Sequence, residues 1–343
     1  MKSIYRLGID LAKQNFELCG VDETGRVIFR RTLKRAKLSE FMVNLPKTRV
    51  FMEACASSHY WARKFKHLGH EVGLIPAQFV KPFLKSQKND RNDALAIVEA
   101  GLRPTMSFVS IKQPWQQDLQ SVHRVRSRIV KNLVEINNQI HGLLGEYGVL
   151  VKAGVKGFKR QVQEILETPN EDLTDAMRAL LSELWVEYLE LERRKQFYTD
   201  KIETLSRADS SCQKLEALPG VGPMTATAFI THIGNPQDYK NGRQAAASLG
   251  LVPRQHSSGG RVQLLGITKR GDKYLRSLLI HGARAYVSAI KRRPISELSP
   301  YEEKVRRMLE KKHMNVVVVA VANRNARVML TMLKTKECYR GAA

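Results

Sequence analysis

The sequence has few cysteines, no long apolar segment and comparatively few acidic residues. Only 4 of its 343 residues are cysteines, and they lie too far apart for a paired metal-binding motif or an evident disulfide framework. The longest uninterrupted apolar run, from Val316 to Ala322, is far shorter than the roughly 20 residues that a membrane-spanning helix needs. These shortages argue against a disulfide-stabilised scaffold, a zinc-binding protein and a membrane protein.

Met1 to Arg6 lead directly into strand-like sequence, so we expect no secretory signal at the N-terminus. We therefore expect a cytosolic protein. The 57 Lys and Arg residues outnumber the 33 Asp and Glu residues, which gives a formal net charge of +24 and predicts a polyanionic partner. Residues 254–343 hold 20 of these basic residues and only 6 acidic ones, a concentration that favours a phosphate-contacting surface over a merely solvated face.

The first hundred residues have the pattern of a mixed sheet covered by helices. Apolar alternation predicts three short strands between Ile4 and Leu33 and two more at 49–53 and 72–76. Helices are expected at about 60–68 and 90–100. Strands that come first and then alternate with helices are typical of an α/β fold with a mixed sheet.

The middle of the chain predicts a helical arm. Apolar residues recur at steps of three and four from Leu119 to Leu143 and again from Met177 to Leu205, which is the spacing of a heptad seam. Glycines at 145–157 separate the two series. We therefore expect a coiled-coil helical hairpin that buries its seam against itself or against a second subunit, and we assign no chemistry to its residues.

Four acidic residues are candidates for a metal site. Asp10 and Glu53 each end an apolar strand, whereas Asp90 and Asp93 stand three residues apart at the start of a helix and would share one face. Mg²⁺ prefers oxygen ligands, and a pair of such ions can stabilise the attacking and leaving oxygens of phosphoryl transfer. Each residue alone also has an ordinary explanation as a turn, surface or helix-capping residue.

Two segments of the C-terminal part are further candidates. Gly220 and Gly222 favour a helix-hairpin-helix turn whose backbone amides bind a DNA phosphate, although a tight turn without a ligand explains them equally well. Ser257 and Ser258 precede a Gly-Gly pair. By composition alone, a serine in such a run is far more often a flexible loop residue than a nucleophile.

The order of these motifs resembles the bacterial insertion-sequence transposases that join a RuvC-like DEDD domain to a C-terminal serine domain, the bridge-RNA-guided recombinases. The resemblance rests on Gly-Ile-Asp-Leu-Ala-Lys at 8–13, Met-Glu-Ala at 52–54, Lys-Asn-Asp-Arg-Asn-Asp-Ala at 88–94, Leu-Pro-Gly-Val-Gly-Pro at 218–223, Leu-Gly-Leu-Val-Pro-Arg at 249–254 and Thr-Lys-Arg-Gly-Asp at 268–272. Residues 323–327, Asn-Arg-Asn-Ala-Arg, resemble the branch whose elements carry subterminal inverted repeats.

This resemblance implies an α/β RNase H-like (RuvC-like) domain at 1–110, the coiled-coil arm at 111–212 and a mainly α-helical serine domain at 213–343. It implies that Mg²⁺ binds to Asp10, Glu53, Asp90 and Asp93, and that Ser258 attacks the DNA backbone to form a covalent serine–DNA intermediate. Besides the two glycines, the residues expected to contact nucleic acid are Arg254, Arg261, Lys269, Arg270 and Arg276.

The partners implied by the resemblance are donor and target DNA, a structured guide RNA and further copies of the chain in a dimer or tetramer, with no membrane. The place of action is the bacterial cytoplasm, at the nucleoid. Two alternatives stay open. A RuvC-like nuclease would hydrolyse branched DNA with metal alone and form no covalent intermediate, and a non-enzymatic scaffold would use the four acids only structurally.

Overall fold

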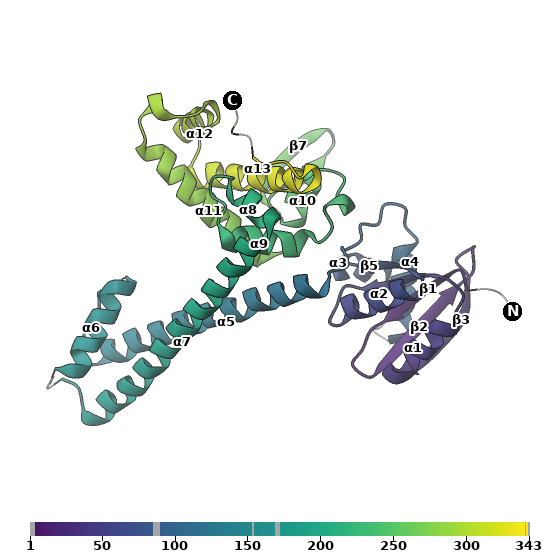
Figure 1. The fold of residues 1–343 in the computed structure, drawn as a ribbon, viewed down its shortest axis with the longest axis horizontal. Helices are drawn as coiled ribbons and strands as arrows, with labels where there is room; N and C mark the ends of the chain where they lie inside the picture. The colour runs from purple at the N-terminus through teal and green to yellow at the C-terminus, as the bar shows by residue number, and fades with distance from the viewer. Residues whose placement is uncertain (1–3, 85–89, 153, 169–171, 340, 342–343) are drawn as a thin grey trace. The chain divides into compact units, whose positions relative to one another are not determined.

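The computed structural model describes residues 4–84, 90–152, 154–168, 172–339 and 341, with the side chains at 90, 91, 155, 156 and 258 outside the description. The chain divides into two compact units, Met1–Pro114 and Trp115–Ala343, and Figure 1 labels most of their helices and strands. The first boundary lies close to the predicted one at residue 110. The predicted separation of the arm from the C-terminal domain stays a prediction.

The first unit is built on a five-stranded sheet in the order β3-β2-β1-β4-β5. Strand β1 (Arg6–Asp10) pairs antiparallel with β2 (Asn15–Val21), and β2 pairs antiparallel with β3 (Val27–Lys34). On its other side β1 runs parallel to β4 (Arg49–Glu53), which runs parallel to β5 (Glu71–Ile75). The predicted mixed sheet is therefore confirmed.

Helices cover both faces of this sheet. On one face, α1 (Arg35–Asn44) and α2 (Ser58–His67) share a core with Leu7 and Ile9 of β1. On the other face, α4 (Asp90–Gly101) packs against side chains of β2, β4 and β5. The connection from β5 to α4 contains α3 (Ala77–Val80) and the 3₁₀ turn η1 (Lys81–Phe83).

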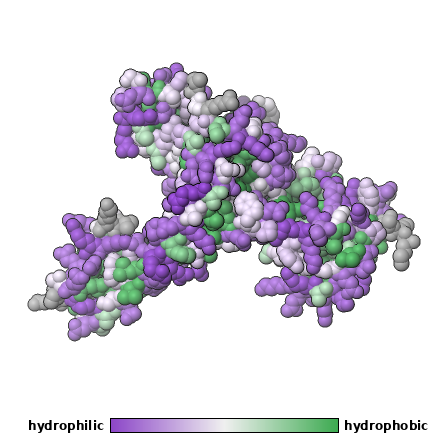
Figure 2. All heavy atoms as spheres, viewed as in Figure 1, coloured by the Kyte–Doolittle hydropathy of each residue, from purple (hydrophilic) through white to green (hydrophobic). Residues whose placement is uncertain are grey.

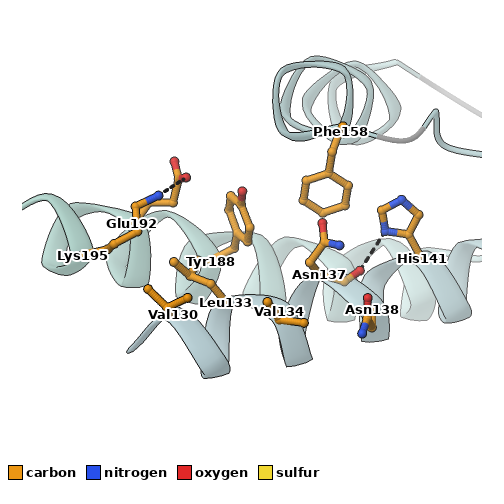
Figure 3. Close-up of a pocket in the computed structure, with 11 residues that line it drawn as sticks. Val130, Leu133, Val134, Asn137, Asn138, His141, Phe158, Tyr188, Glu192 and Lys195 are labelled. Atoms are coloured by element: carbon orange, nitrogen blue, oxygen red, sulfur yellow. Dashed lines mark hydrogen bonds and ion pairs between the residues drawn. The ribbon is translucent and has the colours of Figure 1, made fainter. Parts of the chain in front are cut away.

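The second unit begins with the arm, formed by α5 (Pro114–Glu146), α6 (Val155–Glu167) and α7 (Asp175–Ala208). The two predicted seams share one core, in which Ile136 of α5 and Leu191 of α7 are buried. A cavity of about 610 Å³ opens beside this core, and Figure 3 shows residues of all three helices around it. The helices and their buried seams are as predicted, whereas coiled-coil geometry stays a prediction.

Helix α6 differs from the expectation, because the glycines at 145–157 predict a break between the two long helices. Its Phe158 is only 1% exposed and points toward the pair of long helices in Figure 3. The ring stacks on His141 of α5 with centroids 4.9 Å apart and meets Tyr188 of α7 edge-on at 5.3 Å. One aromatic side chain thus joins the three helices of the arm.

The C-terminal part of the second unit is a helical domain with one hairpin. Its helices are α8 (Ser210–Glu216), α9 (Pro223–Ile233), α10 (Gly242–Ser248), α11 (Lys273–Arg292), α12 (Pro300–Lys311) and α13 (Met314–Thr335), with the 3₁₀ turns η2 (Pro236–Asp238) and η3 (Ile295–Glu297). Between α10 and α11 stands an antiparallel hairpin of β6 (Pro253–Ser258) and β7 (Arg261–Ile267), which was not predicted.

By length and composition, α13 is the one described helix that could cross a membrane, and half of its apolar window is buried within the protein. Val317, Val321, Ala326 and Leu330 belong to the core that α13 shares with α9, α10 and α11. Helix α13 is therefore explained as a core helix of the C-terminal domain.

Candidate active site

Two of the predicted acidic residues end neighbouring strands. In the parallel pair of β1 and β4, Ile9 lies opposite Met52, and Asp10 and Glu53 are the next residues of the two strands. Because parallel strands have their carboxyl ends at the same edge, the register places both carboxylates side by side at that edge of the sheet.

Both carboxylates belong to the sheet face that α4 covers. Gly8, two residues before Asp10, faces α4 so closely that a Cβ there would lie 2.5 Å from the carbonyl oxygen of Ala94. Phe51, two residues before Glu53, is buried against the same helix. Since side chains alternate along a strand, Asp10 and Glu53 share this face.

The pKa of the Cys55 thiol depends on both carboxylates. Burial raises its pKa, and the carboxylates of Glu53 and Asp10 raise it further, to about 11. Both acids therefore act on one thiol at the end of β4. Sequence reasoning assigned no role to any cysteine. The available signal was the position of Cys55, two residues after a strand-ending glutamate.

Asp93 stands at the start of α4, beside the close contact between Ala94 and Gly8. Its Oδ1 atom is buried and has no hydrogen-bond partner among the described residues. A buried carboxylate oxygen without a partner is unfavourable, and a bound cation would satisfy it. Asp93 therefore fits the predicted role of a metal ligand.

The four predicted ligands are only partly brought together. Asp90 lies one helical turn before Asp93, but its side chain is outside the described part of the chain. Among the described side chains, no three His, Cys, Asp or Glu residues form a ready-made metal cluster. The structure thus brings Asp10 and Glu53 together on the sheet face that α4 covers. Asp93 of α4 has a buried carboxylate oxygen that a metal ion could bind.

Ser258 is the last residue of β6 and pairs with Arg261, the first residue of β7. Gly259 and Gly260 close the hairpin with φ angles of 56° and 77°, as a two-residue type I′ turn requires. The serine therefore stands in a strand at the hairpin tip, and its side chain is outside the description. The neighbouring Ser257 hydroxyl accepts a hydrogen bond of 3.0 Å from the side chain of Gln255.

The two glycines of the predicted DNA-binding turn have different environments. Gly220 has a φ of +83°, and a Cβ there would lie 2.8 Å from the carbonyl oxygen of Gly282 in α11. Close packing of the turn on α11 thus explains Gly220 without a ligand. A Cβ at Gly222 would meet nothing within 4 Å, so the backbone there is open to a ligand such as a phosphate.

Four of the five predicted basic contacts are exposed, namely Arg254, Arg261, Lys269 and Arg270. Arg276 is only 8% exposed, and its Nη1 donates to the carbonyl oxygens of Leu249 at 3.0 Å and Arg270 at 2.9 Å. The expectation that Arg276 binds nucleic acid is therefore corrected, because its guanidinium already binds two backbone carbonyls inside the domain.

Comparison with known proteins identifies the class to which this fold and site belong. Residues 7–149 match a family described as a transposase with a DEDD domain, and residues 212–298 match the transposase family IS116/IS110/IS902. Both matched regions lie within a chain that also resembles whole transposases along almost all of its length.

A probable family 20 transposase from Pseudomonas aeruginosa is 44% identical over 98% of this chain and 99% of its own length. The transposase for insertion sequence element IS1111A of Coxiella burnetii is 40% identical over 100% of this chain and 93% of its own. The transposase for IS1328 of Yersinia enterocolitica is 37% identical over 96% of both. The chain belongs to the IS116/IS110/IS902 family of insertion-sequence transposases, enzymes that cut and rejoin DNA.

Proposed function

We propose that this transposase recombines DNA under the guidance of a structured RNA, through a covalent serine–DNA intermediate and with Mg²⁺ at the acidic site. The observation that carries the metal part of the proposal is the arrangement around α4. Asp10 and Glu53 end adjacent strands on the face that α4 covers, and the buried Oδ1 of Asp93 lacks a partner among the described residues.

Asp10, Glu53 and Asp93, together with Asp90, would hold the Mg²⁺ ions. When bound, such ions neutralise charge that develops on the phosphate oxygens. The apolar residues of β1 and β4 are buried, those of β4 on both faces of the sheet, so the strand ends hold the two carboxylates in fixed positions. This rigidity suits a site that must recruit ions and a DNA strand together.

Ser258 would supply the nucleophile. Its hydroxyl oxygen forms a bond to the phosphorus of the scissile phosphate while the bond from phosphorus to the 3′ oxygen breaks. The serine loses its proton, and the 3′ oxygen gains one and becomes a free hydroxyl. Because the phosphodiester is exchanged for a phosphoserine ester and no water is consumed, the 3′-hydroxyl of a new strand can later reverse the step without ATP.

The basic C-terminal region supports contact with DNA and with a guide RNA. Arg261 pairs with Ser258 in the hairpin, and Arg254 lies exposed on the same β6 strand. Guanidinium groups bind phosphates in a bidentate manner and stabilise charge on them. The net charge of +24 suits a protein that holds both DNA and RNA through their backbones.

The helices of the arm would form the contact between subunits. Val186, Leu189 and Phe197 of α7 are 63%, 45% and 57% exposed, although they are large and apolar. Their spacing places them on one side of the helix, and Figure 2 shows apolar residues reaching the surface of the arm. Burial of this stripe against a second copy would supply the predicted subunit contact.

The serine step is tested by comparing Ser258→Ala with Ser257→Ala. The holoenzyme, purified with its RNA, is incubated with DNA that carries the ends of its own element. Denaturing gels then separate covalent protein–DNA adducts from free DNA. We expect Ser258→Ala to abolish adducts while RNA binding persists, and Ser257→Ala to retain them.

If the Ser258→Ala protein still formed adducts, the nucleophile would have to be another residue. A parent protein that yields 5′-phosphate and 3′-hydroxyl products without any adduct would instead favour the metal-dependent nuclease. A non-enzymatic scaffold would be indifferent to Asp10→Asn in every strand-transfer assay.

A further inference from the structure

The hairpin β6–β7 projects from its domain and is joined to it through two short segments, 248–252 and 268–272, which we call the neck. The described side chains of residues 253–257 and 259–266 are all exposed. An isolated two-stranded hairpin is only marginally stable in water. Its direction, and therefore the position of its tip, must be set at the neck.

The backbones of the two neck segments touch directly. The amide of Thr268 donates to the carbonyl of Val252 at 2.9 Å, and the amide of Lys269 donates to the carbonyl of Gly250 at 3.2 Å. A Cβ at Gly271 would overlap the carbonyl oxygen of Ser248. The neck therefore has no room for a larger residue at this crossing.

Two side chains from the domain bind the neck carbonyls. Arg276 of α11 bridges both segments, because its Nη1 donates to Leu249 at 3.0 Å and to Arg270 at 2.9 Å. Asn323 of α13 donates from Nδ2 to the carbonyl of Leu251 at 3.1 Å. Asn323 begins the Asn-Arg-Asn-Ala-Arg motif, for which the proposed chemistry provides no role.

A third side chain, His232 of α9, also bridges the two segments. Its Nε2 lies 3.0 Å from Oγ of Ser248, and its Nδ1 lies 3.5 Å from Oδ2 of Asp272. The Ser248 hydroxyl also donates to the carbonyl of Ala245 at 2.8 Å, which holds it on α10. The imidazole therefore contacts Ser248 in the first neck segment and Asp272 in the second.

Asp272 is held in its charged form. Burial raises its pKa, but hydrogen bonds from His232 and from the backbone N–H of Leu275 lower it, with a net result of about 2. The same carboxylate caps α11 by accepting from the Leu275 amide at 3.0 Å. The histidine thus connects Ser248, in the neck segment before the hairpin, to Asp272, which follows the hairpin and caps the N-terminus of α11.

We infer that His232, Arg276 and Asn323 are positioning residues, which aim the β6–β7 hairpin and its tip serine at the scissile phosphate. They come from α9, α11 and α13, and each binds the neck without reaching the tip. The inference rests on the proposed nucleophilic role of Ser258. A misplacement of about 1 Å at a reacting group can lower a rate about 100-fold, so loss of these contacts acts on the chemical step.

The test compares His232→Gln and Asn323→Ala with a matched control, Asn325→Ala. Asn325 is a buried amide in the same helix and donates to the carbonyl of Pro219 at 3.0 Å, outside the neck. For each holoenzyme we would measure the single-turnover rate constant of adduct formation at saturating DNA, the DNA dissociation constant and the melting temperature. Trypsin cleavage after Arg254 reports the mobility of the hairpin.

For the two neck variants we expect the rate constant to fall about 10- to 100-fold, with little change in DNA affinity and with faster tryptic cleavage of the hairpin. Asn325→Ala is expected to lower the melting temperature by a similar amount and to keep the parent rate constant. The inference is overturned if both neck variants keep the parent rate while Ser258→Ala abolishes adducts. If Ser258→Ala still forms adducts, the proposed function fails, and the positioning role fails with it.

Discussion

His123 of α5 leads to a prediction about the pH dependence of stability. The side chain is 3% exposed, and it joins the arm to the C-terminal domain through Tyr274 of α11 at 3.0 Å and Thr227 of α9 at 2.9 Å. The Thr227 hydroxyl donates to the carbonyl of Pro223 at 2.6 Å. It therefore accepts from Nε2 of the histidine, while Nδ1 accepts from the tyrosine hydroxyl, as a neutral imidazole allows.

Burial lowers the pKa of His123 from 6.5 to about 4, and the nearby Arg126 also lowers it. The folded protein therefore resists protonation of this ring, whereas the unfolded chain binds a proton below pH 6.5. Stability from the neutral ring is complete above pH 6.5 and is lost as the pH falls toward 4. At about 1.4 kcal/mol per pKa unit, the full loss is roughly 3 kcal/mol, of which about 2 kcal/mol is lost at pH 5.

The assay is urea unfolding of the parent protein and of His123→Gln at pH 7 and pH 5. The variant is expected to be less stable at pH 7, because glutamine fills the site less well. Its further loss between pH 7 and pH 5 should be about 2 kcal/mol smaller than that of the parent, since contributions from other groups cancel in the comparison. Equal losses in the two proteins would refute the argument that His123 is buried in its neutral form.

Three other perturbations have defined outcomes. Gly8→Ala should push α4 away from β1, because the added Cβ would lie 2.5 Å from the carbonyl oxygen of Ala94. We expect a large loss of adduct yield and a smaller change in the melting temperature. Gly282→Ala would overlap the carbonyl of Gly220 and should lower the melting temperature at a cost of about 1–3 kcal/mol. Mg²⁺ bound at the acid pair should lower the pKa of the Cys55 thiol from about 11, so alkylation in a Cys338→Ser background should accelerate at pH 8 to 9 when Mg²⁺ is added. Unchanged alkylation would argue against a metal beside Glu53.

The sequence predicted those elements whose apolar residues follow a clear period. Buried faces are present on the strands around Ile9 and Met52 and on the helices α5 and α7. Because a buried face needs apolar residues at regular intervals, these elements can be recognised from the spacing of their apolar residues. Helix α1 was missed, since only Leu38 and Met42 are buried in it. The β6–β7 hairpin was missed because its strands bury no face at all. The remaining signal was the Gly-Gly pair after Ser258, which the type I′ turn requires.

For the candidate site, the order of the motifs predicts which residues carry chemistry but not how they are held. The strand-end positions of Asp10 and Glu53 follow from their place after apolar strands. The internal role of Arg276 could not be read in the same way, because its partners are backbone carbonyls that only the folded chain brings together. Composition cannot distinguish such an arginine from an exposed one such as Arg270.

The two bridging histidines of the second unit have partners that respond differently to acid. His123 lies between two hydroxyls, and burial lowers its pKa to about 4, so its contribution to stability falls between pH 6.5 and pH 4. His232 lies between Ser248 and the carboxylate of Asp272, whose pKa of about 2 keeps that carboxylate charged at pH 5. Acidification to pH 5 should therefore weaken the attachment of the arm and leave the charged cap of the neck in place. At that pH, urea resistance should fall while tryptic cleavage after Arg254 keeps its rate per unit of trypsin activity. Faster cleavage would show that the neck loosens together with the arm.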